Sequence, residues 1–267
     1  MSRLAGTFET LAAAGRTALV PYLTVGDPDV AVTRDCVLAA VDAGADVLEL
    51  GVPFSDPMAD GPVIQRSSAR ALAAGTSLRR VLELVGELRA HVSQPIVLFG
   101  YYNPFMQYGL DVLARDVRAA GADGLLCVDA PPEEAGELRA AADGAGLDLI
   151  PLLAPTTPPA RARMIASTAR GFLYFVSVLG VTGARDRLPP ELPDMVGRIR
   201  RVTALPIAVG FGVQTPEQAG WVASFADGVV VGSAIVREVE QGGAADAPAR
   251  VGRLVASLRD GIRAAGR

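Results

Sequence analysis

The sequence of 267 residues contains no lysine, and all 25 of its basic side chains are arginines. A class I aldolase and a pyridoxal-phosphate enzyme each need a lysine to form a Schiff base, and a P-loop needs one to bind phosphate. The absence of lysine therefore excludes these three kinds of chemistry from the chain itself. We accordingly expect no cofactor to be held by this chain.

Histidine and cysteine are scarce as well, because His91, Cys36 and Cys127 are the only residues of these types. Zinc and iron sites are built largely from such ligands, and a hydrolytic triad needs a histidine. The sequence therefore predicts no metal site and no triad. The lone histidine falls late in a helical segment, and the two cysteines are predicted to be buried apolar thiols.

No apolar run reaches the length of about 18 residues that a membrane helix needs. Glu9 and Arg16 occupy the region where a signal peptide would be apolar. The formal net charge of −4 argues against a nucleic-acid-binding face, which is usually basic. These absences predict a soluble cytoplasmic protein that binds neither a membrane nor a nucleic acid.

The chain does contain eight short β-rich apolar runs, each followed by a stretch with helical spacing. The runs are TALVPYLT from Thr17, DVLELGV from Asp46, PIVLFGYY from Pro95, DGLLCVD from Asp123, LDLIPLLAP from Leu147, GFLYFVSV from Gly171, PIAVGFG from Pro206 and DGVVVGS from Asp227. Nearly continuous valine, leucine and isoleucine is typical of parallel strands covered on both faces. The alternation predicts a single (β/α)8 TIM barrel over residues 1–267, with an open doubly wound sheet as the alternative.

Two local patterns mark the boundaries between these units. Ser77 precedes a segment with apolar residues at helical intervals up to Val92, and serine is suited to cap it. The tripeptide Gly-Ala-Asp precedes both the second strand, at 44–46, and the fourth strand, at 121–123. A glycine there can end the preceding helix in a left-handed conformation, so the repeat predicts equivalent helix-to-strand turns.

The units are unequal, because the second and the sixth carry long loops after the strand. These loops are GVPFSDPMADGPVIQ, residues 51–65, and LGVTGARDRLPPELP, residues 179–193. Since both follow a strand, they project from the carboxyl-terminal face, where barrel enzymes bind their substrates. We expect the two loops to cover the site as lids.

Carboxylates lie in and after the second strand. Side-chain alternation places Glu49 on the face opposite to Leu48 and Leu50; if the leucines pack against helices, Glu49 points into the barrel, where burial would raise its pKa toward neutrality. Asp56 and Asp60 follow in the loop, where aspartate is also a common turn or capping residue. Two carboxylates are suited to acid and base catalysis. A buried structural glutamate and ordinary loop aspartates are the alternative interpretation.

The last two strands end in glycines suited to an anion. VGFG, residues 209–212, closes the seventh strand, and VGSA, residues 231–234, closes the eighth. Backbone N–H groups at Gly212 and Gly232, and at a helix that begins beyond Gly232, can bind phosphate without a lysine. The alternative is that both glycines only make tight turns.

Aromatic residues are few, but every tyrosine falls in a strand end or in the segment that follows one. Phe211 joins them from the seventh strand. Their gathering at one end of the barrel predicts a ligand with a flat apolar portion beside its phosphate. The tyrosines are Tyr22, Tyr101, Tyr102, Tyr108 and Tyr174.

These motifs closely resemble one family, the α subunits of tryptophan synthase. LELGVPFSDPMADGPVIQ carries the resemblance together with PYLTVGDP before it and GVTG, VGFGV and VGSAIV after it, from about Thr17 to Val236. The resemblance implies a lyase of tryptophan biosynthesis, which performs the retro-aldol cleavage of indole-3-glycerol phosphate into indole and glyceraldehyde 3-phosphate.

The resemblance also implies roles for individual residues. Glu49 would protonate the departing ring carbon and take the proton of the side-chain hydroxyl, and Asp60 would stabilise positive charge at the ring nitrogen. The residues implied to surround the substrate or to bind its phosphate are Tyr22, Tyr101, Tyr174, Thr182, Gly183, Phe211, Gly212, Gly232 and Ser233. Tyr22 departs from the family pattern, because phenylalanine is common there and the extra hydroxyl needs a partner.

The family further implies a partner, a pyridoxal-phosphate β subunit in an α2β2 assembly that receives indole through an internal tunnel. The residues implied to face this partner are Pro53, Asp56, Pro57, Asn103, Pro104 and Phe105. The alternatives are an independent lyase that releases free indole, another phosphate-binding barrel enzyme, and a barrel that binds a phosphate ligand without catalysis. The presence of both Glu49 and Asp60 argues against the last of these.

Overall fold

The strands form one continuous parallel sheet. The computed structural model describes residues 2–177 and 188–266, and within these ranges nine strands follow the order β5-β4-β3-β2-β1-β9-β8-β7-β6. Every pairing between neighbours is parallel. The strands are β1 (Ala18–Thr24), β2 (Leu48–Gly51), β3 (Ile96–Gly100), β4 (Gly124–Cys127), β5 (Asp148–Leu149), β6 (Leu152–Leu153), β7 (Leu173–Val176), β8 (Ile207–Gly210) and β9 (Gly228–Val231).

The segment from 148 to 153 closes this sheet into a barrel. Its first part, β5, pairs with β4, and its second part, β6, pairs with β7. Between the two parts, Ile150 donates its N–H to Leu125 and Pro151 accepts a hydrogen bond from the N–H of Tyr174. The two short strands are therefore successive parts of one barrel strand. The predicted (β/α)8 barrel is confirmed, and the open-sheet alternative is excluded, because both ends of the strand order meet in this segment.

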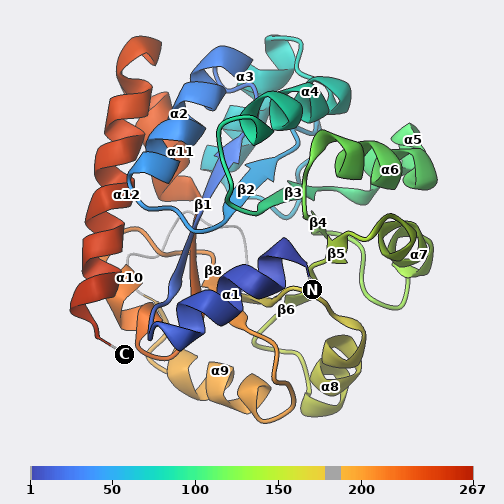
Figure 1. Ribbon diagram of the computed structural model, residues 1–267, viewed down its shortest axis with the longest axis vertical. Coiled ribbons are helices and arrows are strands. Elements are labelled where there is room, and N and C mark those ends of the chain that lie inside the picture. The colour runs from blue at the N-terminus through green and yellow to red at the C-terminus, as the bar shows by residue number, and fades with distance from the viewer. Residues whose placement is uncertain (1, 178–187, 267) are drawn as a thin grey trace.

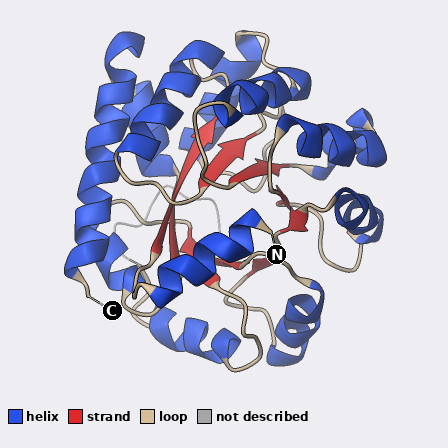
Figure 2. Ribbon diagram, viewed as in Figure 1, coloured by secondary structure: helices blue, strands red, loops and turns tan. Residues whose placement is uncertain are grey.

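Helices surround the strands (Figure 1, Figure 2). Within the described ranges, no helix has the length and the apolar character of a membrane span. In chain order the helices are α1 (Arg3–Ala13), α2 (Val30–Asp42), α3 (Pro62–Ala73), α4 (Leu78–Arg89), α5 (Tyr102–Tyr108), α6 (Leu110–Ala120), α7 (Gly136–Ala145), α8 (Pro159–Thr168), α9 (Leu192–Arg200), α10 (Pro216–Ala223), α11 (Ser233–Glu240), a short 3-10 helix (Ala244–Asp246) and α12 (Ala247–Ala264).

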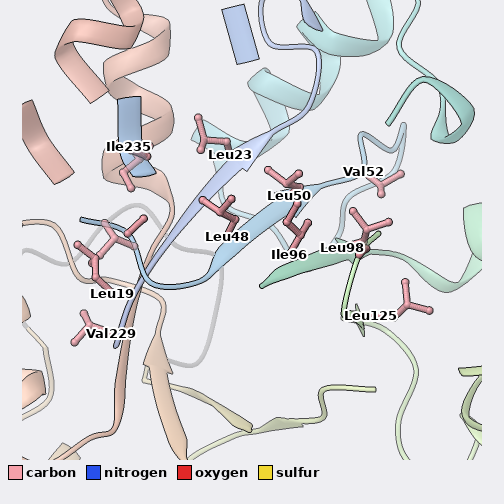
Figure 3. Packing of buried hydrophobic residues seen from close by; sticks show 14 of the residues in the cluster. Leu19, Leu23, Leu48, Leu50, Val52, Ile96, Leu98, Leu125, Val229 and Ile235 are labelled. Atoms are coloured by element: carbon pink, nitrogen blue, oxygen red, sulfur yellow. The ribbon is translucent and has the colours of Figure 1, made fainter. Parts of the chain in front are cut away.

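Alternate side chains of each strand enter two different packing layers. Leu19 and Leu23 of β1, and Leu48 and Leu50 of β2, belong to the layer between strands and helices (Figure 3). Val20, which lies between Leu19 and Leu23 in the chain, enters the barrel interior instead. This is the two-residue period of a β-strand. Full burial of one such aliphatic side chain contributes about 1.5–3 kcal/mol, so the alternation fixes which residues face the interior.

Helix α1 covers the amino-terminal end of the barrel and lies in front of the strands in Figure 1. Leu4, Phe8 and Leu11 are the buried residues of this helix, and all three join the interior layer. Their spacing of four and three residues places them on one helical stripe. The interior is therefore filled from this end, which leaves the carboxyl ends of the strands as the place for a site.

The predicted turn and cap residues have the expected conformations. Gly44 and Gly121 have φ values of 103° and 95°, so each enters the left-handed region that favours glycine. The side chain of Ser77 caps α4 by accepting a hydrogen bond from the N–H of Arg80. Local sequence patterns thus predict these helix ends, and Arg259 and Arg89 add hydrogen bonds to the carbonyls of Gly44 and Gly121.

The aspartate of each Gly-Ala-Asp tripeptide ties neighbouring strands together at the amino-terminal end. Asp46 accepts a hydrogen bond from the N–H of Leu19 at 2.8 Å, and Asp123 accepts one from the N–H of Ile96 at 2.9 Å. Arginines pair with both carboxylates: Arg259 with Asp46, and Arg3 and Arg89 with Asp123. The repeat therefore supplies charge-paired links at the base of the barrel, and the link at Asp123 is buried.

Candidate active site

Glu49 lies in the barrel interior. It occupies the second position of β2, between Leu48 and Leu50 of the outer layer, so its side chain takes the opposite face. The residue is 1% exposed, and it is the register partner of Tyr22 on β1 and of Val97 on β3. This is the inward orientation that side-chain alternation predicts.

The surroundings of Glu49 disfavour its charged form. Burial, with a smaller contribution from the nearby Asp60, raises the pKa of the Glu49 carboxyl from 4.5 to about 8. Its Oε1 atom is buried and has no hydrogen-bond partner among the described residues. Because an unpaired carboxylate is costly to bury, Glu49 holds a proton at neutral pH and can donate it.

Asp60 lies in the loop after β2, two residues before the start of α3 at Pro62. Its side chain is buried, and Oδ2 accepts a hydrogen bond from the phenol of Tyr101 at 2.8 Å. The same phenol oxygen accepts a hydrogen bond from the N–H of Ala59 at 3.1 Å. A single hydroxyl therefore holds both the loop backbone and its carboxylate.

The pKa values of both carboxyls are raised, but by different amounts. Burial raises the pKa of Asp60 from 3.8 to about 6, against the opposing effect of the Tyr101 hydrogen bond. At neutral pH Asp60 is therefore mostly ionised while Glu49 is mostly protonated. Such a separation is the pattern of an acid beside a charge-stabilising group. Neither carboxyl pairs with an arginine within the described ranges, which favours the functional interpretation over a structural ion pair.

Tyrosines of β1 and β7 line the interior around Glu49. The hydroxyl of Tyr22 packs against Gly51 and that of Tyr174 packs against Gly210, and a Cβ at either glycine would overlap the hydroxyl. Phe211 meets Tyr174 edge to face, with ring centroids 5.8 Å apart. The rings of Tyr22 and Tyr174 therefore form an aromatic wall. The glycines beside them leave room for the phenol oxygens but not for further side chains.

The other two tyrosines lie elsewhere, which corrects the interpretation that all of them line a ligand pocket. Tyr102 and Tyr108 are the first and last residues of α5, and both pack against the layer between strands and helices. The phenol of Tyr108 donates a hydrogen bond to Asp116 of α6 at 3.0 Å. The helical turn after β3 therefore rotates these two residues away from the site.

The turns after β8 and β9 lie side by side, because these two strands are paired. Phe211 and Gly212 follow β8 with φ values of 67° and 99°, and Ser177 donates a hydrogen bond to the carbonyl of Phe211. A left-handed conformation is uncommon for a phenylalanine and stores strain. After β9, Gly232 precedes α11, which begins at Ser233. Unpaired N–H groups at such a turn and helix start can bind an anion.

The guanidinium of Arg237 fixes this region from the side of α11. It donates to the side chain of Gln214 at 2.8 Å and to the carbonyl of Ser233 at 3.2 Å. It therefore ties the start of α11 to the loop after β8. Thr182 and Gly183, the other residues expected near a phosphate, lie outside the described residues.

A cavity of about 740 Å³ lies beside the loop after β2. Met58 and Ala59 of the loop after β2 line it, together with Phe211 and residues of β4 to β6. Its lining does not include Glu49 or Asp60. Because Ala59 precedes Asp60 and Phe211 packs on Tyr174, the cavity reaches both the loop and the aromatic wall of the site.

The residues expected to face a partner divide into exposed and buried ones. Asp56 and Asn103 are exposed, and Pro57 and Pro104 are half-buried. Phe105 is fully buried, because Gly100 leaves space for its ring, and it belongs to the outer packing layer. Pro53 is buried as well. The side chains of Phe105 and Pro53 are therefore packed within this chain, and the expectation that these six residues face a partner stays a prediction.

The fold and the site together define a class, the (β/α)8-barrel enzymes, which bind their substrates at the carboxyl ends of the strands. The chain belongs to the family of tryptophan synthase alpha chains, whose model matches residues 8–263.

Individual relatives agree over almost the whole length. The tryptophan synthase alpha chain of Geobacter sulfurreducens is 53% identical over 262 residues, which are 98% of this chain and 99% of that protein. The crystal structure of tryptophan synthase subunit alpha from Legionella pneumophila is 42% identical, covers 99% of both chains and superposes with a TM-score of 0.92. A structure of Mycobacterium tuberculosis tryptophan synthase is 40% identical over 98% of both chains, with a TM-score of 0.90.

Proposed function

We infer that this chain cleaves indole-3-glycerol phosphate to indole and glyceraldehyde 3-phosphate, as the alpha chain of a tryptophan synthase. The observation that carries the chemistry is the pair of buried carboxyls, Glu49 and Asp60. Burial raises the pKa of Glu49 to about 8 and that of Asp60 to about 6. Retro-aldol cleavage of this substrate needs a proton for the ring, a stabilised positive charge and a base for the side-chain hydroxyl. Two carboxyls with separated pKa values supply these functions without a metal or a Schiff base.

We assign the proton transfers to Glu49. Its carboxyl protonates the ring carbon that bears the glycerol chain, which leaves positive charge on the ring nitrogen. The resulting carboxylate then takes the proton of the neighbouring side-chain hydroxyl as the carbon–carbon bond breaks and its electron pair returns to the ring. Asp60 accepts the ring N–H and stabilises the positive charge, and the hydrogen bond from Tyr101 supports its orientation.

The remaining contacts follow the two halves of the substrate. We propose that Tyr22, Tyr174 and Phe211 pack on the indole and glycerol portions, since their rings line the interior beside Glu49. The phosphate would bind to N–H groups of Gly212, Gly232 and Ser233, with Thr182 and Gly183 closing over it. Backbone donors suit this role because the chain has no lysine.

We further propose that a β subunit docks on the mouth of the barrel in an α2β2 assembly and holds the pyridoxal phosphate. Exposed apolar side chains support a docking surface there: Met58 of the loop after β2 is 85% exposed, and Met106 of α5 is 48% exposed. Asp56 and Asn103 border these methionines in the chain. We expect a cytoplasmic location, which would suit the two free thiols.

The test is to incubate the purified chain with indole-3-glycerol phosphate and to follow indole, with and without a cognate β subunit. We expect slow release by the chain alone and a large increase with the partner. No indole under either condition would reject the assignment. Association measured by sedimentation separates a subunit of the complex from an independent lyase, because only the former forms a stable assembly.

The phosphate assignment has its own test. Gly212→Asp places a carboxylate among the proposed backbone donors, so the affinity for indole-3-glycerol phosphate should fall about tenfold or more through charge repulsion. Gly212→Asn, of similar size but neutral, is the matched control. Equal affinity in the aspartate variant and the wild type would contradict an anion site at this turn.

A further inference from the structure

Arg237 contacts both of the segments that are proposed to bind the phosphate. Its Nε donates a hydrogen bond to the carbonyl of Ser233 at 3.2 Å, and its Nη2 donates one to the side-chain oxygen of Gln214 at 2.8 Å. Ser233 is the first residue of α11, and Gln214 follows Gly212 by two positions in the loop after β8. The guanidinium is therefore one hydrogen bond away from each segment.

The charge of this guanidinium is not matched by a carboxylate among the described residues. Both acceptors of Arg237, a main-chain carbonyl and a side-chain amide, are neutral. Glu240, which ends the same helix, pairs instead with Arg66 and Arg70 of α3. Because Arg237 is half-buried and a cation is costly to bury without a partner, its place in the fold calls for an explanation.

The amino-terminal end of α11 is an unfavourable place for a cation. The first hydrogen bond of the helix runs from the N–H of Val236 to the carbonyl of Gly232, so the N–H groups of residues 233–235 precede it, and no side chain caps them. Such an end has partial positive charge, which repels a cation and attracts an anion. The Cα of Arg237 lies in the last turn, but its side chain extends back to the carbonyl of Ser233.

Arg250 shows the opposite arrangement at the other end of this helix. It is also half-buried and bonds to neutral oxygens, the carbonyls of Glu238 at 2.9 Å and Gly243 at 3.2 Å. The carboxyl-terminal end of a helix favours a cation, so the place of Arg250 needs no further ligand. The place of Arg237 is favourable only when an anion lies beside it.

We propose that Arg237 supplies a fixed positive charge to the phosphate site and acts on the anion across Ser233. The inference rests on the proposed function, because the anion is the phosphate of that substrate. A phosphate monoester has a charge of about −1.5 to −2 at pH 7. Backbone N–H groups offer only partial charges, and the chain has no lysine. Ser233 and Gln214 already hold the guanidinium in place, so little further ordering is needed when the substrate binds.

The test compares two ligands, indolepropanol phosphate and indolepropanol. Neither can be cleaved, because both lack the side-chain hydroxyl whose proton the base removes. Titration of the full chain, followed by the NMR signals of its backbone N–H groups, gives both dissociation constants. Arg237→Gln should weaken binding of the phosphate ester about tenfold at low salt and change that of the alcohol little. The loss should shrink as salt is added, and Arg237→Lys should recover most of the affinity.

Gln214→Glu separates the charge of Arg237 from its role as a tie between two segments. The substitution keeps the shape of the side chain and gives Arg237 a carboxylate partner in place of a neutral oxygen. The tie becomes stronger, whereas the positive charge is neutralised. The proposal therefore predicts weaker binding of the phosphate ester by Gln214→Glu, and a tie alone predicts equal or tighter binding.

Arg250→Gln is the matched control, because it removes a half-buried arginine from the other end of α11. Its affinity for the phosphate ester should equal that of the wild type. Kinetics give a second readout: Arg237→Gln should raise KM for indole-3-glycerol phosphate about tenfold and change kcat little, since the phosphate is bound equally before and during the reaction.

Equal affinity for the phosphate ester in Arg237→Gln and the wild type would overturn the inference. An equal loss for the alcohol would do so as well, because a charge effect requires the phosphate. Unchanged or tighter binding of the ester by Gln214→Glu would also overturn it, and this variant decides the question if Arg237→Gln does not fold. Failure of the wild type to bind the ester would instead reject the proposed function.

Discussion

The two ends of the barrel use carboxylates in opposite ways. At the amino-terminal end, Asp46 and Asp123 accept hydrogen bonds from strand N–H groups and pair with arginines. At the mouth, which is the end formed by the carboxyl ends of the strands, Glu49 has an oxygen with no partner among the described residues. Asp60 is held there by the neutral phenol of Tyr101. Both ends lie in the same sheet, so the difference comes from the partners that the sequence supplies.

Because of this difference in partners, we expect the base to contribute to stability and the mouth to carry the reaction. A buried carboxylate with an arginine stays charged, and its links hold neighbouring elements together. A buried carboxyl without a cation has a raised pKa and can give up or accept a proton near neutrality. Substitutions at the base should therefore change the free energy of unfolding, and substitutions at the mouth should change the rate of the reaction.

Apart from substitutions of Glu49, the substitution at the mouth with the largest expected effect on the rate of indole release is Asp60→Asn. Asparagine keeps the size of the side chain and can still accept from Tyr101, but it cannot offset positive charge on the ring nitrogen. We expect indole release to fall by about two orders of magnitude or more. Asp116→Asn, which changes a partly exposed carboxylate of α6, is the control, and an equal loss in that variant would contradict a specific role for Asp60.

At the base, Asp123→Asn should lower the free energy of unfolding by about 3–5 kcal/mol, because it leaves Arg89 and Arg3 without their charge partner. Urea denaturation measures this change. At a temperature where the variant is folded, its kcat/KM for indole release should stay close to that of the wild type. A loss of activity as large as that of Asp60→Asn would break the proposed division between the two ends.

A smaller effect, of roughly 3–4 kcal/mol between pH 5 and pH 8, concerns the pH dependence of stability. Because the pKa of Glu49 is about 8 in the folded chain and 4.5 is its ordinary value, the folded chain binds more protons than the unfolded chain between these pH values. The free energy of unfolding therefore falls as the pH rises from about 4.5 to about 8. In Glu49→Gln this component is absent, so denaturation at pH 5 and at pH 8 should differ less than in the wild type. An unchanged difference would contradict the raised pKa.

The smallest effect is expected at Gly51. A Cβ at this position overlaps the hydroxyl of Tyr22, so Gly51→Ala should cost about 1–3 kcal/mol of stability. Tyr22→Phe in the same chain should recover part of this loss, since it removes the oxygen. Urea denaturation measures the cost of Gly51→Ala in the wild type and in Tyr22→Phe. Equal costs in the two backgrounds would show that the hydroxyl is not packed on the glycine.

Much of this architecture could be predicted because it depends on local periodicity. The two-residue alternation around Glu49 predicts its inward orientation, and the left-handed glycines at 44 and 121 follow from the position of Gly-Ala-Asp before a strand. The division of one barrel strand into β5 and β6 was not predicted, although Pro151 in the middle of LDLIPLLAP is a visible signal, because a proline cannot donate to the ladder.

The contacts of the site were harder to predict from the sequence, because they join residues far apart in the chain. The hydrogen bond from Tyr101 to Asp60 spans 41 positions, and the contact between Thr24 and Ser67 spans 43. Neither has a sequence pattern of its own. The burial of Phe105 depends on the space above Gly100, which only the packing of α5 on β3 defines. The roles of Glu49 and Asp60 stay predictions until their variants are measured.

The most direct measurement is the rate of indole release from indole-3-glycerol phosphate by Glu49→Gln, beside Asp123→Asn under the same conditions. If the mouth carries the chemistry and the base carries the stability, Glu49→Gln should stay folded and lose about three orders of magnitude in rate, while Asp123→Asn stays close to the wild type. Full activity in Glu49→Gln would contradict the account.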